Sequence, residues 1–239
     1  MMTAIIVQAR TGSRRLPGKV LEKIGSRTVL EEVLGRCCRV PGADVVVCAI
    51  PEKSDDDALI APAERMGAIV VRGSETDVLG RYAKAAATVG ATVVMRITSD
   101  CPLVDPEICG AVLRLRAREG ADYASNAIER SFPHGLDCEA FTAAALADAA
   151  AKTSDAYDRE HVTPWLIRAP HLKRANLHSD DPALARLRWT LDYPEDLAFV
   201  RAVFAALPPN SPGSMADVFK VIQRNPAIVG INAIRNPAR

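Results

Sequence analysis

The sequence has few aromatic residues and almost no net charge. Phe, Trp and Tyr make up 5% of the 239 residues, and 30 Lys and Arg balance 29 Asp and Glu to a formal charge of +1. This balance argues against a protein that binds nucleic acid or anionic membranes, because both are polyanions. Hydrophobic residues still make up 49%, which excludes wholesale disorder. A chain of this length needs no disulfide or metal for stability.

Long hydrophobic runs are absent as well. The longest lie at 4–7, 45–50 and 93–95, far below the roughly 18–20 residues of a membrane helix. The first run is also too short for a signal peptide. The six cysteines form no CxxC pair, so they are interpreted as small buried hydrophobic residues in a reducing compartment. We therefore expect a cytoplasmic protein without a membrane segment.

Short apolar runs alternate with helical periodicity in the first half of the chain. Strands are predicted at 4–7, 45–50, 68–71 and 92–97, and helices at 29–37, 55–66, 77–89 and from 106 onward. Thr28 and Asp105 are expected to cap the helices that follow them. Strands that alternate with helices predict βαβ units and a mostly parallel sheet, and therefore an α/β fold.

The pattern changes after residue 123. Helices are predicted at 142–151, 159–168 and 194–207, and strands at 174–177 and 187–191. We expect one α/β domain over residues 1–207, in which 126–186 is an insertion over one face of the sheet. Residues 208–239 are predicted to form a linker and a helical appendage.

A basic loop that contains glycine follows the first predicted strand. Residues 8–19, QARTGSRRLPGK, include three Arg, one Lys, two Gly and two hydroxyls, but no acid. Glycine lets the backbone approach an anion closely, and the amide, guanidinium and ammonium groups donate hydrogen bonds to it. The loop is a candidate phosphate site, although it lacks the Walker A pattern. A solvated basic turn is the alternative.

An aspartate follows the strand predicted at 92–97. Ligands of an open α/β sheet bind at the carboxyl ends of its strands, so we expect Asp100 opposite the basic loop. Mg²⁺ commonly takes one or two carboxylates together with substrate phosphates. The two segments therefore indicate a Mg²⁺–nucleotide site, with a plain turn residue as the alternative for Asp100. The acidic run Asp55–Asp57 is interpreted as a helix start, which the helix dipole favours, and not as a metal motif.

Five segments resemble the sugar-acid cytidylyltransferases, which include CMP-KDO synthetase and acylneuraminate cytidylyltransferase. They are Arg10-x-x-Ser13-x-Arg15-Leu16-Pro17-Gly18-Lys19 and the stretches VRGSETDVLGRY (71–82), RITSDCPL (96–103), REHVTP (159–164) and RWTLDYPED (188–196). Together they are similar to the spore-coat polysaccharide biosynthesis branch over most of residues 3–207, and the tail around Asn225-Pro226 and Asn232 also looks like that branch. The resemblance implies a Rossmann-like nucleotidyltransferase fold and a homodimer, with partner residues near the acceptor pocket.

The resemblance also implies roles for individual residues. Those that match the family's loop for the CTP triphosphate are Arg10, Ser13, Arg15 and Lys19. Asp100 matches a metal-binding aspartate that the family carries within a Gly-Asp-x-Pro sequence, with Ser99 here in place of the glycine. Asp192 matches a second metal-binding aspartate at the start of an Asp-x-Pro-Glu-Asp motif. A cap for the helix that begins at Pro194 is a compatible role for Asp192.

The resemblance also implies residues for the base pocket and the acceptor pocket. The residues at positions where the family approaches the cytosine base are Ala9, Arg72 and Arg81. A surface ion pair is the alternative for each arginine. The acceptor residues expected from the insertion are His134, Asp137, Glu139, Glu160 and His161. A strand over 137–141 would place Asp137 and Glu139 on one face, and a structural histidine is the alternative for His161.

The resemblance, together with these charges, implies a reaction. A sugar hydroxyl would attack the α-phosphorus of CTP and pyrophosphate would leave, which needs positioning and charge neutralisation. Lys19, Arg10 and Asp100 are the expected catalytic residues, and Mg²⁺ held by Asp100 and Asp192 would polarise the α-phosphate. The alternatives are a nucleotidyltransferase that uses another nucleotide or a sugar phosphate, a GT-A-like glycosyltransferase, and a catalytically silent binding protein. The sequence does not name the sugar acceptor.

Overall fold

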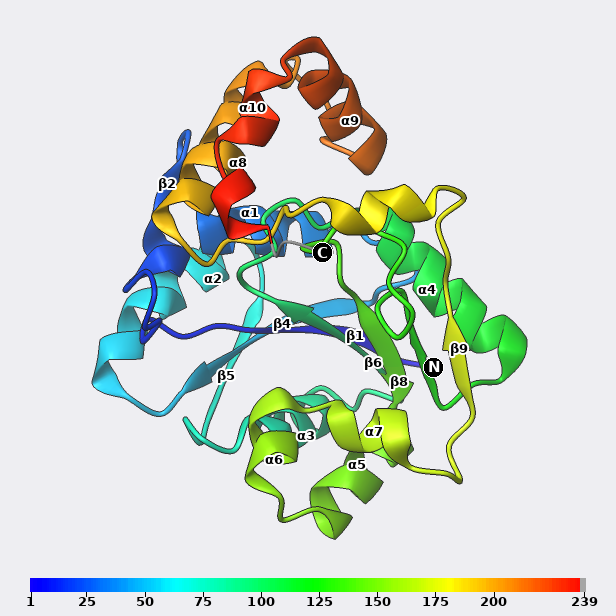
Figure 1. The fold of residues 1–239 in the computed structure, drawn as a ribbon. Coiled ribbons are helices and arrows are strands. Elements are labelled where there is room, and N and C mark those ends of the chain that lie inside the picture. The colour runs from blue at the N-terminus through cyan, green and yellow to red at the C-terminus, as the bar shows by residue number, and fades with distance from the viewer. Residues whose placement is uncertain (237–239) are drawn as a thin grey trace.

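The computed structural model describes residues 1–236, which form a seven-stranded sheet with helices on both faces (Figure 1). The sheet order is β5-β4-β1-β6-β8-β7-β9. Strands β1, β4, β5 and β6 are parallel, β8 is antiparallel to both of its neighbours, and β9 is parallel to β7. The predicted α/β class with a mixed, mostly parallel sheet is therefore confirmed. The strands are β1 (Thr3–Gln8), β4 (Val45–Pro51), β5 (Ile69–Gly73), β6 (Val93–Thr98), β7 (Tyr123–Ser125), β8 (Glu139–Thr142) and β9 (Arg174–Asn176).

Side chains of β1 alternate between two apolar layers. Ile5 and Val7 belong to the layer under α1 (Val29–Cys37), α2 (Ile60–Arg65) and α4 (Pro106–Glu119). Ala4 and Ile6 belong to the opposite layer, under α3 (Val78–Thr88), α5 (Ala143–Lys152) and α7 (Pro164–Arg168). Figure 1 shows these two groups of helices on opposite sides of the sheet. Because both faces are buried, the central strands are nearly continuous apolar runs, which made them predictable.

Side chains at the helix starts explain where α1 and α4 begin. The Thr28 hydroxyl accepts a hydrogen bond from the Glu31 amide at 3.2 Å, and the Glu31 carboxylate accepts one from the Thr28 amide at 2.6 Å. Asp105 accepts from the Glu107 amide at 2.8 Å. Both predicted caps are confirmed. Short elements join the larger ones: η1 (Lys19–Leu21), the hairpin of β2 (Lys23–Ile24) and β3 (Arg27–Thr28), and η2 (Ser54–Leu59).

The second half of the chain departs from prediction in two places. The single helix expected at 159–168 is wrong: α6 (Ala156–His161) and α7 are separate, because the backbone turns at Val162, whose φ is 72°. The strand expected at 187–191 is also wrong. That segment makes one isolated bridge, between His134 and Arg188, and its Leu191 amide bonds the Asp100 carbonyl at 2.8 Å. Hydrogen bonds to the backbone of His134 and Asp100 hold this segment in an extended conformation.

The region at 126–186 both adds to the sheet and covers it. It supplies β8 and β9, and its helices α5, α6 and α7 lie on the same side of the sheet as α3 (Figure 1). The short η3 (Pro182–Arg186) follows β9. This region therefore borders the carboxyl end of β6, where the segment that carries Asp100 begins.

The C-terminal elements form a third apolar cluster. They are α8 (Pro194–Ala206), α9 (Met215–Arg224), α10 (Ala227–Gly230) and η4 (Ala233–Arg235). Trp189 and Phe199 pack in this cluster with Val218 of α9, so the tail is joined to the segment that carries Asp192. Across residues 1–236, none of the helices has the length and apolar character needed to cross a membrane.

Candidate active site

The basic loop and Asp100 leave the sheet at the same edge. β1 and β6 are parallel neighbours, with Gln8 in register with Thr98, so the segments after these residues lie side by side. A cavity of about 670 Å³ lies between them. The sequence-predicted residues that line it are Ala9, Arg10, Ser13, Arg15, Lys19, Arg81, Asp100, Glu160, His161 and Asp192.

Lys19 joins the two expected metal-binding aspartates. Its Nζ lies 3.1 Å from Asp100 Oδ2 and 3.1 Å from Asp192 Oδ1, and donates to the Leu191 carbonyl at 2.7 Å. Gly18, whose φ is 69°, turns the loop back immediately before Lys19, a conformation that glycine adopts without strain. The two carboxylates therefore converge on one point at the mouth of the basic loop.

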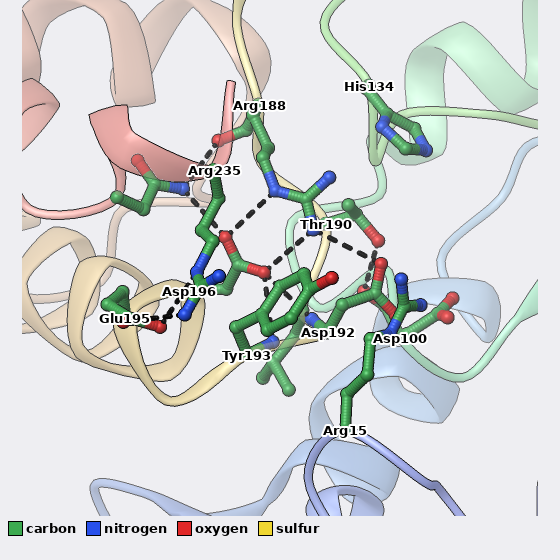
Figure 2. A network of polar contacts seen from close by, with 12 residues as sticks. Arg15, Asp100, His134, Arg188, Thr190, Asp192, Tyr193, Glu195, Asp196 and Arg235 are labelled. Atoms are coloured by element: carbon green, nitrogen blue, oxygen red, sulfur yellow. Dashed lines mark hydrogen bonds and ion pairs between the residues drawn. The ribbon is translucent and has the colours of Figure 1, made fainter. Parts of the chain in front are cut away.

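Asp192 is surrounded by three cations. Besides Lys19, its carboxylate contacts Arg15 Nη2 at 2.6 Å and Arg188 Nη2 at 3.1 Å, as Figure 2 shows for the two arginines. The two amides just before α8 donate to the Asp196 carboxylate, Asp192 N at 2.9 Å and Tyr193 N at 3.1 Å. The helix cap expected as a compatible role for Asp192 is not found, because Tyr193 is the residue that precedes α8 and Asp196 accepts from its amide.

The charge state of Asp100 follows from its surroundings. Burial by itself would raise the pKa of the Asp100 carboxyl, but the ion pair with Lys19 and a hydrogen bond from Thr98 outweigh it and hold the pKa below the ordinary 3.8. The carboxylate is therefore ionised at neutral pH. An ionised oxygen ligand of this kind suits a hard divalent cation.

The donor set fits a metal that is shared with a substrate. Within residues 1–236 no group of three or more His, Cys, Asp or Glu surrounds a metal site. Asp100 and Asp192 would therefore hold an ion only together with phosphate oxygens and water, which is how Mg²⁺ is commonly bound in nucleotide sites.

Asp56 is a site residue that sequence reasoning missed. It is 2% exposed, and it accepts hydrogen bonds from the Thr11 amide at 2.6 Å and the Thr11 hydroxyl at 2.9 Å. The run at 55–57 does begin a helical turn, η2, as expected. No local pattern signals the second role, because Thr11 lies 45 positions away. Asp56 thus fixes the middle of the basic loop.

The structure brings one of the two predicted base-pocket arginines to the cleft. Arg81 is buried, donates to the Ser74 carbonyl at 2.8 Å, and its Nε has no hydrogen-bond partner within residues 1–236. Burial lowers its pKa. Arg72 is not among the described residues that line the cleft, since it pairs with Asp57 at 2.6 Å and donates to the Lys53 carbonyl. The surface ion pair is the arrangement found for Arg72.

A smaller cavity of about 230 Å³ shares Arg15, Asp100 and Asp192 with the larger one. It also holds three predicted acceptor residues, namely His134, Asp137 and Glu139, together with Arg96 and Thr190, which were not predicted. Asp137 lies just before β8 and not within it, yet it faces the same cavity as Glu139.

The acids of the smaller cavity are already paired. Glu139 pairs with Arg96 and accepts from the Tyr123 hydroxyl at 2.6 Å, and Asp137 pairs with Arg130. Burial lowers the pKa of His134, so its imidazole is neutral at neutral pH. The cavity is therefore lined by acidic and basic side chains and by a neutral imidazole.

Glu160 and His161 lie in the larger cavity, apart from the other predicted acceptor residues. Both come from the end of α6. Glu160 faces Arg10 at 3.8 Å, and the His161 ring lies 4.3 Å from that of Tyr157. Their placement opposite the basic loop puts them beside the expected phosphate contacts and not in the smaller cavity.

Comparison with known proteins shows the family of the chain. A family model described as cytidylyltransferase matches residues 4–188. The spore coat polysaccharide biosynthesis protein SpsF of Bacillus subtilis (strain 168) is 33% identical over 229 residues, which cover 92% of this chain and 94% of that protein. A solved cytidylyltransferase from Leptospira borgpetersenii serovar Hardjo-bovis (strain JB197) matches with a TM-score of 0.90 at 30% identity, over 96% of this chain and 97% of that one.

A more distant structure shares the fold. CMP:2-keto-3-deoxy-manno-octonic acid synthetase, solved in complex with CTP, matches with a TM-score of 0.65 at 16% identity, over 86% of this chain and 99% of that one. The fold is the Rossmann-like nucleotidyltransferase fold. The chain belongs to the cytidylyltransferase family, and the resemblance seen in the five sequence segments is confirmed.

Proposed function

We propose that the protein transfers CMP from CTP to a hydroxyl of a sugar acid or related sugar and releases pyrophosphate, in the synthesis of a surface polysaccharide. One observation carries the proposal: Lys19 joins Asp100 and Asp192 at the mouth of a loop rich in arginine. The relative named for spore coat polysaccharide biosynthesis supports a role in the synthesis of a surface polysaccharide. The CTP found in the distant structural neighbour supports the nucleotide.

The basic loop would receive the triphosphate. Arg10 and Arg15 have about half of their side chains exposed, at 47% and 52%, so both reach the cleft with little rearrangement. The hydroxyl of Ser13 and the loop amides add hydrogen-bond donors. Because Asp56 holds Thr11, these donors are arranged before CTP arrives.

The two carboxylates would hold a divalent ion with the phosphates. Bound there, Mg²⁺ would neutralise phosphate charge and polarise the α-phosphate. The three cations around Asp192 hold its carboxylate at the cleft. Asp100 and Asp192 are therefore the proposed metal ligands, and Lys19 is placed to exchange its carboxylate contacts for phosphate contacts.

The proposed chemistry is a displacement at the α-phosphorus. An acceptor oxygen forms a bond to that phosphorus, the bond to the bridging oxygen of the β-phosphate breaks, and the hydroxyl proton passes to solvent. Lys19, Arg10 and Arg15 would stabilise the charge that builds on the leaving pyrophosphate. The acceptor would lie in the smaller cavity, whose His134, Asp137 and Glu139 suit sugar hydroxyls.

Arg81 and the backbone near Ala9 would contact the base. Arg81 is buried at the cleft, and its Nε has no partner among the described residues; a guanidinium donor there matches the acceptor atoms of cytosine. A buried donor without a partner is costly, so a bound base would relieve that cost.

Pyrophosphate release tests the proposal. The protein is incubated with Mg²⁺, one of CTP, UTP, GTP or ATP, and a panel of sugar acids, neutral sugars and sugar phosphates. We expect release with CTP and one acceptor class, and loss of release with EDTA. Asp100→Asn should lower turnover by about 10²-fold, whereas Asp180→Asn, at an exposed position, should not. Preference for another nucleotide, or sugar transfer from a nucleotide sugar, would overturn the proposal.

A further inference from the structure

The C-terminal segment reaches into the carboxylate network of the site. Asn232, between α10 and η4, is 3% exposed. Its side-chain amide donates to Asp196 Oδ1 at 3.0 Å and to the backbone carbonyl of Arg188 at 3.1 Å. A residue of the tail thus bonds both the carboxylate and the backbone that support Asp192.

Asp196 links Asn232 to Asp192 in two ways. Its fully buried carboxylate accepts from the Asp192 amide at 2.9 Å, which fixes the backbone of that residue. It also binds Arg188 Nε at 3.0 Å and Nη2 at 2.8 Å. The same Nη2 lies 3.1 Å from Asp192 Oδ2. Asp196 therefore sets both the position and a counter-ion of Asp192.

A second tail residue contacts the same region. The Arg235 guanidinium lies 4.0 Å from the centroid of the Tyr193 ring and donates to both oxygens of Glu195, at 3.2 and 3.0 Å. The Arg15 guanidinium lies 5.0 Å from the same ring. Figure 2 shows Tyr193 lying among Arg15, Arg235 and the two carboxylates Asp192 and Asp196. The tail thus contacts residues both before and after Asp192 in the sequence, namely Arg188 and Tyr193.

We propose that the C-terminal segment completes the active site, with Asn232 as a positioning residue that acts through Asp196 and Arg188 on the Asp192 carboxylate. The inference rests on the proposed function, because it takes Asp192 as a ligand of the Mg²⁺–nucleotide complex. Neither hydrogen-bond partner of the Asn232 side chain, Arg188 or Asp196, is among the described residues that line the larger cavity. Removing the Asn232 side chain takes away one of the two donors to Asp196 Oδ1, the other being Arg188 Nε. The side chains of Asp196 and Arg188 then become more mobile, and the Asp192 carboxylate loses its fixed orientation.

Two readouts on Asn232→Ala test the proposal. The first is hydrogen exchange at the amides of Asp192 and Tyr193, both of which donate to Asp196. The second is the Mg²⁺ concentration that gives half-maximal thermal stabilisation by CTP. We expect faster exchange, and a Mg²⁺ requirement raised by about 10-fold, the scale of losing a residue that orients a metal ligand. Saturating Mg²⁺ should restore the full stabilisation by CTP.

Ile234→Ala is the matched control, because Ile234 lies in the same segment and is 79% exposed. It should change neither readout. Asn232→Asp should raise both the amide exchange rates and the Mg²⁺ requirement more than Asn232→Ala does, since it places a second carboxylate against Asp196. A lower Tm for Asn232→Ala without a change in either readout would show a merely structural contact and overturn the proposal. Absence of CTP stabilisation in the unaltered protein would refute the proposed function instead, and the exchange rates would still decide the role of Asn232.

Discussion

The ammonium nitrogen of Lys19 lies 3.1 Å from a carboxylate oxygen of Asp192, although 173 positions separate the two residues. The segment at 187–191 makes this contact possible. It runs past the end of β6, where the Leu191 amide bonds the Asp100 carbonyl at 2.8 Å, and so delivers Asp192 to the basic loop. The proposed nucleotide site is therefore assembled from three distant parts of the chain.

Lys19→Ala should lower the rate of pyrophosphate release by about 10²-fold or more, the scale of losing one key electrostatic contact. The substitution removes the cation that both carboxylates share. Steady-state turnover at saturating CTP and Mg²⁺ measures the effect. Lys23→Ala is the matched control, since Lys23 is exposed. Equal turnover in both variants would contradict the assignment.

Asp56→Ala should weaken CTP binding by about 10-fold, because the basic loop loses the carboxylate that holds the Thr11 amide and hydroxyl. We also expect a loss of about 1.5–3 kcal/mol in the free energy of unfolding, the usual contribution of a hydrogen bond to a charged group. Calorimetric titration with CTP and urea unfolding measure the two effects. The neighbouring Asp55 is exposed, and Asp55→Ala should leave CTP affinity unchanged. A normal CTP affinity in Asp56→Ala would show that the loop does not need this anchor.

Arg81→Met should raise the KM for CTP by about 10-fold with a smaller effect on kcat, because it removes a buried donor from the proposed base pocket. Arg72→Met is the control that the structure supplies, since Arg72 is bound to Asp57 instead. Steady-state kinetics with varied CTP separates the two variants. If Arg72→Met raises the KM as much as Arg81→Met does, the assignment of the base pocket is wrong.

The parts of the molecule that could be predicted from sequence are those set by local pattern. Strands such as β1 and helices such as α1 follow from apolar periodicity, and Thr28 and Asp105 mark their helix starts by side-chain chemistry alone. The basic loop and Asp100 could be placed together because parallel strands share an edge.

What could not be predicted depends on contacts between distant segments. The role of Asp56 depends on Thr11, and that of Asn232 on Asp196. The segment at 187–191 has the apolar content of a strand, but the structure holds it by bonds to His134 and Asp100 in place of a sheet partner. Arg72 and Arg81 look alike in sequence, and only tertiary structure shows that an acid, Asp57, holds the first one away from the cleft.

Asp196 predicts a measurable dependence of stability on pH. Burial would raise the pKa of its carboxyl, but Arg188, the Asp192 amide and Asn232 outweigh burial and hold it below the ordinary 3.8. The unfolded chain therefore takes up this proton first as the pH falls. The stabilisation is fully present above the unfolded pKa and is lost as the pH falls through the folded pKa.

Urea unfolding below about pH 4 tests this dependence. The free energy of unfolding should fall less steeply with decreasing pH in Asp196→Asn than in the unaltered protein. Asp180→Asn, at an exposed position, should follow the unaltered protein. Identical slopes in all three proteins would mean that Asp196 does not contribute to acid sensitivity.

A crystal structure of the protein with CTP and Mg²⁺ is the most direct measurement of the central claim, which is that one cleft joins the basic loop to two metal-binding carboxylates. We expect the triphosphate on the loop between Arg10 and Lys19, and a divalent ion coordinated by Asp100, Asp192 and phosphate oxygens. A triphosphate bound elsewhere, or an ion that contacts neither aspartate, would contradict the account.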